Sequence, residues 1–495
     1  MPQPNVLFVF PDQHRGEWLG SRVDNPGVRT PNLDALAARG TAFTNALTPS
    51  PLCSPARACL AHGRRYDAQP VKHNQHDVDV SLPNLYRAMR DVGYDVLACG
   101  KFDLLKGAMD WGLDGQHGDA LRRLGFTGGI DSAGKHDCLI AANRGLPEPY
   151  AHFLSEAGLF ELHARDFAER HPPIRCYTNV TPSPLPDDAH CDNWIGARAL
   201  DLLKAVPAGK PWFMQINFTG PHEPLDVTEA MLHLYDHVDF PLPVNNHRIE
   251  PDSHQAMRRN YAAMIENIDA WVGKLVAAVA ARGEQDNTLI VYASDHGDEL
   301  GDNDQWHKCL PTHGSIHVPL IIAGPGVHAG HVTTPVDLVD LHATLVDLTS
   351  AERVAAGAGS GESLSPALRG GELGWAARSS GLGGWRTWFD GRYKYVHNHH
   401  GGLTARDIVP ASFDASVNAP ALLFDLGNDP GEQHDISIEQ PAIAARIRSE
   451  LLAEVAACTT NPLGLHFPDN AGGQTIGTSR TTAARIESRR KMTRS

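Results

Sequence analysis

The chain has 495 residues, which is enough for one large domain and a smaller second one. Hydrophobic residues make up 42% of it and charged residues 20%, proportions that are typical of a globular protein and not of a disordered one. Its formal net charge of -15 argues against nucleic acid as a bulk partner.

The N-terminal segment predicts a buried strand and gives no sign of a membrane partner. Residues 6–10 form a continuous apolar run, as in a strand covered on both faces. The first residues lack the basic stretch and the long apolar stretch of a secretory signal peptide. No apolar run approaches the ~18 residues of a membrane span. The eight cysteines are scattered without a C-x-x-C pair, which argues against zinc knuckles and a dense disulfide framework. We expect a cytoplasmic protein with reduced thiols.

Helical and strand-like segments alternate over the next 340 or so residues. The helical segments are 30–40, the first part of 82–101, 190–206, 254–282 and 336–348, and the later strand-like segments are the last part of 82–101, 212–218, 287–295 and 318–326. Because strands that alternate with helices usually pair in parallel, the pattern predicts an α/β sandwich around a large, mostly parallel sheet.

The last third of the chain has a different character. Residues 351–384 are rich in Gly, Ser and Ala and suit a connection or a surface excursion. An Asp-Gly turn lies between two strand-like runs in 385–398, which predicts a hairpin, and a helix is expected at 439–457. We therefore expect a catalytic domain at 1–375, an α+β subdomain at 376–468 and a polar, basic tail at 469–495. The tail is either a frayed terminus or an arm that docks on a partner subunit, which leaves a homo-oligomer open.

One short stretch, "PLCSPARACLAHGR" at 51–64, suits neither an ordinary core nor an ordinary loop. Ser54 is a good helix N-cap, Pro55 suits the first helical position and Gly63 suits the far end. Cys53 would then stand just before a helix N-terminus, where backbone N–H groups gather and anions bind readily. Arg57 follows one turn later. The pattern indicates a site for a cysteine and an anion.

Conspicuous polar residues follow several of the predicted strands. They are Asp12 and Gln13 after the first strand, Lys101 after the strand in 82–101, His222 after 212–218, and Asp295 and His296 near the end of 287–295. In open α/β sheets ligands bind outside the carboxyl ends of the strands. Carboxylates, an amide oxygen and one imidazole suit a divalent cation such as Ca²⁺, Mg²⁺ or Mn²⁺, and the nitrogen ligand also keeps Zn²⁺ open.

With these residues in view, the chain resembles the type I sulfatases of the alkaline phosphatase superfamily. "CSPAR" matches the family's C-x-P-x-R signature, and "LLFDLGNDPGEQHDI" is similar to its closing D-L-x-x-D-P-x-E segment. The resemblance extends over nearly the whole chain and implies an alkaline-phosphatase-like α/β/α sandwich. It also implies that a formylglycine-generating or other sulfatase-maturing enzyme oxidises Cys53 to formylglycine, whose hydrated diol is the nucleophile. The implied metal ligands, most often of Ca²⁺, are Asp12, Gln13, Cys53, Asp295 and His296.

The resemblance assigns the remaining catalytic residues as well. Arg57 would orient the diol and neutralise charge. Lys101, His222 and Lys308 match the residues that grip the oxyanion or protonate the leaving oxygen, and general-acid work suits His222 because an imidazole titrates near neutrality. Asn74 matches an asparagine that relatives often place at the substrate group. Each of these has a plain structural alternative, such as a surface lysine at Lys308 or a turn residue at Asn74.

The chain departs from the family's pattern in two places: beside Lys101, and after the "SDHGDELGD" stretch, where Asn303, His313 and His317 replace the residues that the pattern leads us to expect. The family's G-K-W-H-L is "GKFDL" here, with Asp103 where a histidine commonly helps to bind sulfate. A carboxylate beside a bound anion is unfavourable, so we expect Asp103 to pair with a lysine; the alternative is that it meets a cationic or hydroxyl group of the substrate. Segment 104–190 lies between catalytic motifs and is expected to shape substrate specificity, with Lys135 as a candidate contact; the alternative is a surface insertion with no part in ligand binding.

The favoured function is hydrolysis of a sulfate ester of a small soluble substrate. The same formylglycine machinery would also suit a phosphonate monoester or phosphodiester hydrolase, and the sequence does not separate the two. A third mechanism would use a thiolate directly, since Arg65 follows Cys59 by six residues, but Cys59 falls inside the predicted helix and not on a phosphate-binding loop. A fourth reading is a binding protein whose Cys53 is never oxidised.

Overall fold

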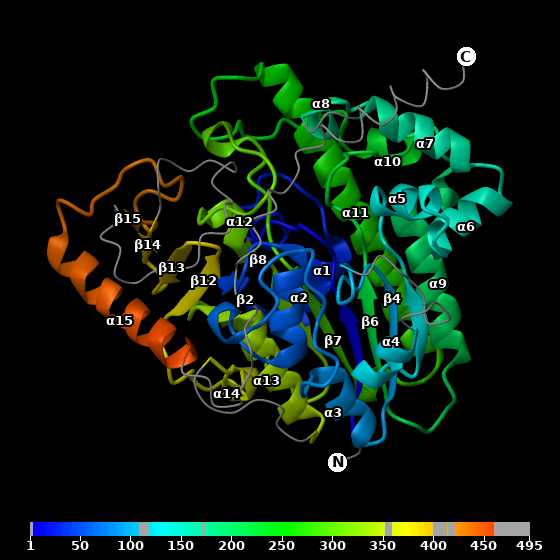
Figure 1. Ribbon diagram of the computed structural model, residues 1–495, viewed down its shortest axis with the longest axis horizontal. Helices are drawn as coiled ribbons and strands as arrows, with labels where there is room; N and C mark the ends of the chain where they lie inside the picture. Colours follow the sequence, from blue (N-terminus) through cyan, green and yellow to red (C-terminus); the bar gives the residue numbers. More distant parts are fainter. Residues whose placement is uncertain are drawn as a thin grey trace.

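The computed structural model describes residues 3–107, 118–170, 174–351, 359–398, 413 and 421–459. They form one large α/β layer structure with a smaller sheet at one side (Figure 1). The predicted tail at 469–495 lies outside the described residues. Within the described part of the chain, no helix combines the length and the apolar character needed to cross a bilayer.

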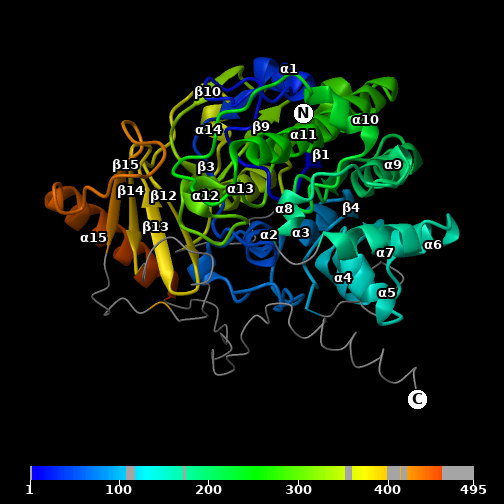
Figure 2. The same ribbon diagram turned by 90° about the horizontal axis from the view of Figure 1, so that it is seen from above.

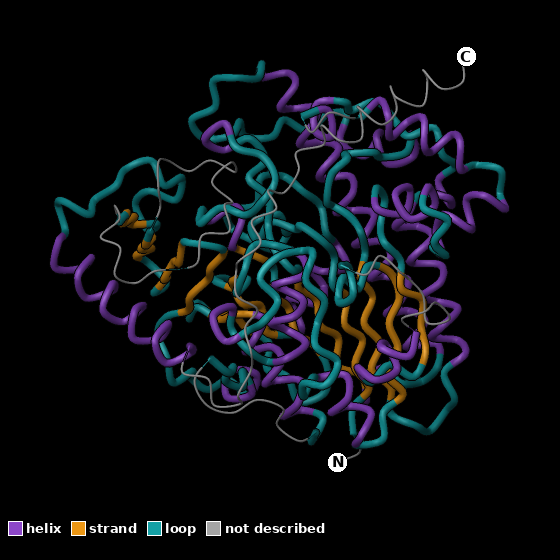
Figure 3. Tube along the Cα trace, in the orientation of Figure 1, coloured by secondary structure: helices purple, strands orange, loops and turns teal. Residues whose placement is uncertain are grey.

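The main sheet has eight strands in the order β10-β2-β9-β7-β1-β6-β4-β5. Figure 3 shows the strands in orange between the surrounding helices. Its strands are β1 (Asn5–Val9), β2 (Thr41–Phe43), β4 (Asp95–Gly100), β5 (Gly128–Asp131), β6 (Trp212–Asn217), β7 (Thr288–Ala293), β9 (Leu320–Ala323) and β10 (Gly330–Val332). The five strands from β7 to β5 run parallel, with β1 at the centre between β6 and β7. β9 runs antiparallel to both of its neighbours, so the sheet is mixed. The predicted α/β fold is confirmed, with a parallel centre.

Fifteen helices are described around the sheets. They are α1 (Pro31–Arg39), α2 (Cys53–His62), α3 (Leu85–Asp91), α4 (Gly118–Leu124), α5 (Asp137–Asn143), α6 (Pro149–Glu156), α7 (Phe160–Glu169), α8 (Arg175–Thr178), α9 (Cys191–Ala205), α10 (Glu229–Leu232), α11 (Pro251–Ala281), α12 (His313–Ile316), α13 (Leu338–Leu348), α14 (Ser365–Leu368) and α15 (Pro441–Thr459). Helices α4 to α8 belong to the segment that we expect to shape specificity. Helices α5, α6 and α7 pack on one another, whereas α4 packs on α3 and α8 packs on α11 (Figure 1).

Alternate side chains of β1 explain the sandwich. Val6 and Phe8 point into a core that includes residues of α2, α3 and α13. Leu7 and Val9 point into a second core with residues of α1, α9 and α11. Successive side chains of a strand leave on opposite faces, so a strand that is apolar at every position must be covered twice. The continuous apolar run at the start of the sequence thus predicts the layer order that Figure 2 shows.

A separate antiparallel sheet occupies the C-terminal part of the described chain. Its strands, in the order β12-β13-β14-β15, are β12 (Arg378–Leu382), β13 (Trp385–Phe389), β14 (Tyr393–His397) and β15 (Leu422–Asp425). The predicted hairpin is confirmed as β13–β14, and Gly391 takes the left-handed φ of 90° that its turn requires. Helix α15 packs on this sheet through Ile447 and Leu451.

A short three-stranded sheet lies between the two larger sheets. It consists of β3 (Ala46–Leu47) flanked by β8 (His317–Val318) and β11 (Val336–Asp337). Leu47, Ile316 and Val339 share an apolar cluster with Trp385 and Phe389 of the C-terminal sheet. The C-terminal sheet is therefore fastened to the main body through an apolar contact that lies close to the helices α2 and α12.

Candidate active site

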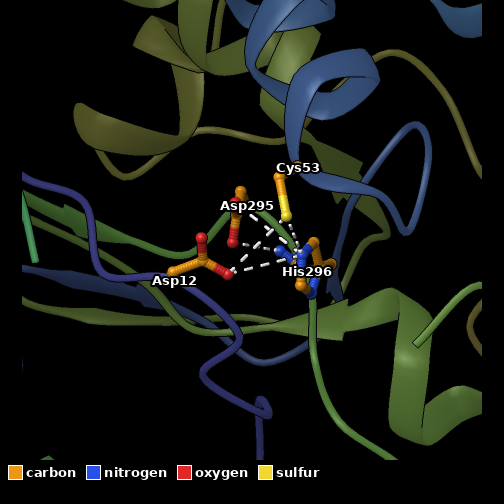
Figure 4. Close-up of side chains that lie close together, drawn as sticks. All are labelled: Asp12, Cys53, Asp295 and His296. Atoms are coloured by element: carbon orange, nitrogen blue, oxygen red, sulfur yellow. Dashed lines mark hydrogen bonds and ion pairs between the residues drawn. The ribbon is translucent and has the colours of Figure 1, made fainter. Parts of the chain in front are cut away.

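Four buried side chains converge at the carboxyl end of the central strands. The potential ligand atoms of Asp12, Cys53, Asp295 and His296, which we call the strand-end cluster, all lie within 4.8 Å of one another. His296 Nε2 is 3.3 Å from Cys53 Sγ, 3.5 Å from Asp12 Oδ1 and 3.8 Å from Asp295 Oδ2 (Figure 4). Buried carboxylates lie this close together only where a cation binds them or where neighbouring groups neutralise their charge.

The fold explains why these residues meet. β1 and β7 are adjacent parallel strands, so the loops that leave their carboxyl ends bring Asp12 beside Asp295 and His296. Backbone N–H of Gln13 donates to Asp295 Oδ1 at 3.0 Å and ties the two loops together. Cys53 is the first residue of α2, and the start of this helix brings its side chain to the other three.

The predicted capping of that helix is wrong in one respect. α2 begins at Cys53 itself, and Leu52 holds the N-cap position without a side-chain hydrogen bond. The backbone N–H of Ser54 donates to Asn74 Oδ1 at 3.0 Å, so a side chain from a distant loop supplies the cap. The local sequence pattern favoured Ser54 as the N-cap, but in the folded protein the contact with Asn74 caps the helix. The predicted helix end is confirmed: Gly63 has φ 63° and its N–H donates to Cys59 O.

The donor set fits a divalent cation. His296 Nδ1 lies 3.0 Å from the carbonyl oxygen of Gly297, so it carries the proton and leaves the Nε2 lone pair facing the cluster. Asp12 and Asp295 are fully buried and bring two carboxylates to the same point. Gln13 stands beside the cluster, but its amide oxygen accepts from Lys308 at 2.6 Å and its NH₂ group donates to Glu223 at 2.7 Å.

Two buried cationic side chains contact the carboxylates of the strand-end cluster. Arg57 Nε donates to Asp295 Oδ2 at 2.9 Å, and the Lys101 ammonium binds Asp12 and lies 3.6 Å from Cys53 Sγ. Burial and Asp12 by themselves would raise the pKa of the Cys53 thiol, but Lys101, Lys308 and His296 outweigh them and hold it well below its usual value. The charges around Cys53 therefore favour a negatively charged group at this position.

His222 and Lys308 form the opposite wall. The Lys308 ammonium hydrogen-bonds His222 Nε2, while His222 Nδ1 lies 2.6 Å from the carbonyl oxygen of Glu223. The Glu223 carboxylate also receives His307 Nδ1 at 2.8 Å. Burial alone would raise the pKa of Glu223, but His222, His307 and Lys308 hold it well below its usual value. The sequence singled out His222 and Lys308 but missed Glu223 and His307, although each directly adjoins one of them along the chain.

A pocket of about 370 Å³ lies against this wall. Its lining includes Asn74, Lys101, Lys106, Lys135, His222 and His307. Lys135 Nζ donates to Asp226 at 2.7 Å and to the carbonyl oxygen of His222 at 3.0 Å, so it buttresses the wall as well as lining the pocket. Asp103 pairs with Lys106 at 3.1 Å and with Lys101 at 3.3 Å, which is the lysine pairing that we expected for it.

The thiolate alternative finds no geometric support at Cys59. Its side chain is fully buried inside α2, and burial raises the pKa of its thiol. Arg65 pairs with Asp337 at 2.9 Å and is not directed at a free anion site. Cys59 is part of the apolar packing between α2 and the C-terminal sheet.

Comparisons with known proteins agree with one another. The family model named Sulfatase matches residues 4–351. An arylsulfatase of Clostridium perfringens is 26% identical over 66% of this chain and 69% of its own length. A choline-sulfatase of Rhizobium meliloti is 28% identical over 70% of this chain and 67% of its own length. The crystal structure of a phosphonate monoester hydrolase of Agrobacterium radiobacter superposes with a TM-score of 0.73 at 25% identity, covering 92% of this chain and 96% of that one.

Proposed function

The chain belongs to the sulfatase family, and on that basis we propose that it hydrolyses sulfate esters of a small substrate, with Cys53 oxidised to formylglycine as the nucleophile. One observation carries the proposal. Cys53 stands at the start of a helix, inside a convergent acceptor cluster, and two lysines of the pocket wall flank it. A nucleophile, a cation site and anion-binding groups are the three parts that ester hydrolysis at sulfur or phosphorus needs.

A divalent cation, with Ca²⁺ as the favoured ion, would be held by Asp12, Asp295, His296 and the side chain at position 53. Gln13 stays a proposed ligand because it directly follows Asp12 and its backbone N–H donates to Asp295, while its amide oxygen accepts a hydrogen bond from Lys308. When bound, the ion supplies Lewis-acid stabilisation of negative charge on oxygen. The hard carboxylate oxygens favour Ca²⁺, Mg²⁺ or Mn²⁺ over softer ions.

The chain's own cations would bind the ester's charged oxygens. Lys101 lies 3.6 Å from Cys53 Sγ, and Lys308 is near enough to lower the pKa of that thiol, so both can neutralise an oxyanion there. Arg57 is fully engaged with Asp295 and with the carbonyl oxygen of Lys101, so its proposed part is to hold those two in place. His222 would deliver a proton to the leaving oxygen through Nε2, the atom that Lys308 contacts, because Nδ1 is turned toward Glu223.

A second candidate function is hydrolysis of phosphonate monoesters or phosphodiesters. The similarity to the crystal structure of a phosphonate monoester hydrolase spans 92% of the chain at 25% identity. Both substrate classes present a single negative charge to the same lysines, so the charge of the site favours neither.

Two measurements test the proposal. Mass spectrometry of the tryptic peptide 40–57 from the native host should find the Cys53 thiol converted to an aldehyde or its hydrate. Matched aryl sulfate and aryl phosphonate esters should then be compared by kcat/KM, with the larger value expected for the sulfate. An unmodified thiol in every copy would contradict the formylglycine mechanism. A larger kcat/KM for the phosphonate would replace the first candidate with the second.

A further inference from the structure

The C-terminal sheet contributes a fully buried ion pair that the proposed chemistry does not use. Lys394 lies on β14 with no exposed surface, and its ammonium contacts the carboxylate of Glu432, whose side chain is 4% exposed. Glu432 is the last residue of the closing D-L-x-x-D-P-x-E segment that the sequence singled out. A buried ion pair seldom stabilises a fold more than an apolar pair of the same size would. The pair therefore calls for another explanation.

Both members of the pair bind the backbone of one loop. Lys394 Nζ donates to the carbonyl oxygen of Pro311 at 2.6 Å, and Glu432 Oε2 accepts from the backbone N–H of His313 at 2.6 Å. This loop, 307–313, carries Lys308 and leads into α12, which lies beside the C-terminal sheet in both views (Figures 1 and 2). Two backbone groups that would otherwise be buried without partners are satisfied by the two ends of one ion pair.

The loop needs such anchors because its backbone is strained. His307 and Cys309, the two neighbours of Lys308, have φ values of 69° and 78°, in the left-handed region that non-glycine residues rarely adopt. Such conformations persist only where the surroundings hold them. On the side of the main body, Glu299 N–H donates to His307 O at 2.8 Å and Cys309 N–H donates to Pro51 O at 3.1 Å. Lys394 and Glu432 are the anchors on the opposite side.

We propose that Lys394 and Glu432 are positioning residues for Lys308: the C-terminal sheet completes the active site by holding the Lys308 loop against the segment that precedes Cys53. The inference rests on the proposed function, since it gives Lys308 a part in binding the ester. It predicts that the C-terminal sheet is required for catalysis although none of its residues lines the described pocket.

The first test is Lys394→Met, which keeps the length of the side chain and removes the donor to Pro311. A shift of about 1 Å in a catalytic group can cost on the order of 10²-fold in rate, so we expect kcat/KM to fall by about 10- to 100-fold, mainly in kcat. Glu432→Gln keeps an oxygen that can accept from His313 and should have a smaller effect. Arg392→Met is the matched control. Arg392 lies in the turn of the same hairpin as Lys394 and pairs with Asp425 of β15 at the surface, so its loss should leave kcat/KM unchanged.

A second background separates positioning from general damage. In Lys308→Ala protein, Lys394→Met should lower kcat/KM no further, because the residue through which it acts is gone. An equal fall with and without Lys308 would overturn the inference, as would wild-type kcat/KM in Lys394→Met.

Amide hydrogen exchange gives a readout that does not depend on the reaction. Peptides spanning 307–313 should exchange faster in Lys394→Met than in wild type, while peptides of β1 and β7 should not change. Unchanged exchange in the loop would overturn the inference. Faster exchange in the loop of a protein that hydrolyses none of the esters would reject the proposed function and still show that the C-terminal sheet holds the loop.

Discussion

Two of the buried ionic clusters in the described part of the chain differ in where their acceptor atoms point. At the N-terminus of α13, Arg378 binds Asp340 at 2.6 Å and Arg65 binds Asp337 at 2.9 Å. Asp337 and Asp340 also accept each other's backbone N–H groups in a capping box. In the strand-end cluster the acceptor atoms of His296 and Asp12 face one another instead. Burial of opposite charges therefore marks structure as often as it marks function, and convergence of acceptors beside a pocket is what distinguishes the strand-end cluster.

The largest expected effect comes from removing the nucleophile. Cys53→Ala should lower kcat/KM by on the order of 10⁴-fold or more, as loss of a covalent catalyst does in other hydrolases. The melting temperature should change little, since the side chain is small and its contacts are polar. Steady-state kinetics and a thermal melt on the same preparation test both halves. Residual activity within tenfold of wild type would remove Cys53 from the mechanism.

Withdrawal of the metal should have the next largest effect. A chelator should lower kcat/KM by on the order of 10³-fold, because metal ions contribute several kcal/mol to such transition states. It should also lower the melting temperature, since an ion that binds only the folded state stabilises it. Adding back Ca²⁺, Mg²⁺ or Mn²⁺ in turn shows which ion restores both properties. Full activity after exhaustive chelation would contradict a metal role for the strand-end cluster.

The cluster at α13 should respond in the opposite way. Arg378→Met leaves Asp340 without its nearest cation and should lower the free energy of unfolding by about 3 kcal/mol, the usual cost of breaking a buried pair on one side. Denaturant titration measures this loss. The kcat/KM of the folded fraction should stay within about twofold of wild type. A selective loss of kcat/KM at unchanged stability would mean that the two clusters are not as distinct as their geometry indicates.

A smaller, pH-dependent effect is expected at a buried histidine within α13. Burial lowers the pKa of His342 from 6.5 to about 4, and the hydrogen bond of its Nδ1 to the carbonyl oxygen of Leu60 offsets this only in part. Between pH 6.5 and 4 the unfolded chain therefore binds a proton that the folded chain does not, so stability falls as pH falls through this range. At pH 5 the contribution amounts to about 2 kcal/mol. Chemical denaturation at pH 7 and pH 5 should show a smaller difference for His342→Gln than for wild type; an equal difference would assign the effect elsewhere.

The sequence predicted those parts of the fold that depend on local pattern. A five-residue apolar run must be covered on both faces, and an Asp-Gly pair between strand-like runs turns a hairpin, so β1 and β13–β14 lie where we expected them. Apolar runs carry no direction, however. The segment that became β9 reads like the parallel strands, and only its pairing with β7 and β2 shows that it runs the other way.

The same limit applies to the candidate site. Strand ends meet at one edge of a sheet, so Asp12, Asp295 and His296 could be brought together by pattern alone. The cap of α2 could not, because it comes from Asn74 on another loop while Ser54 looked sufficient. Nor could the contact between Glu223 and His307, which joins two loops 84 residues apart. Contacts between loops depend on the finished fold and leave no periodic signal.

The place of β1 at the centre of the sheet has a consequence for synthesis on the ribosome. Both of its partners, β6 and β7, come more than 200 residues later in the chain, and β2 must wait for β9 and β10. At about 5 to 20 residues per second, translation needs tens of seconds to supply them. Throughout that interval the segment around Cys53, which is only 1% exposed in the folded protein, stays open to a modifying enzyme. If Cys53 is oxidised as proposed, the late arrival of the central partners sets the time available for the reaction, and slower translation should raise the fraction of chains that carry the modified residue.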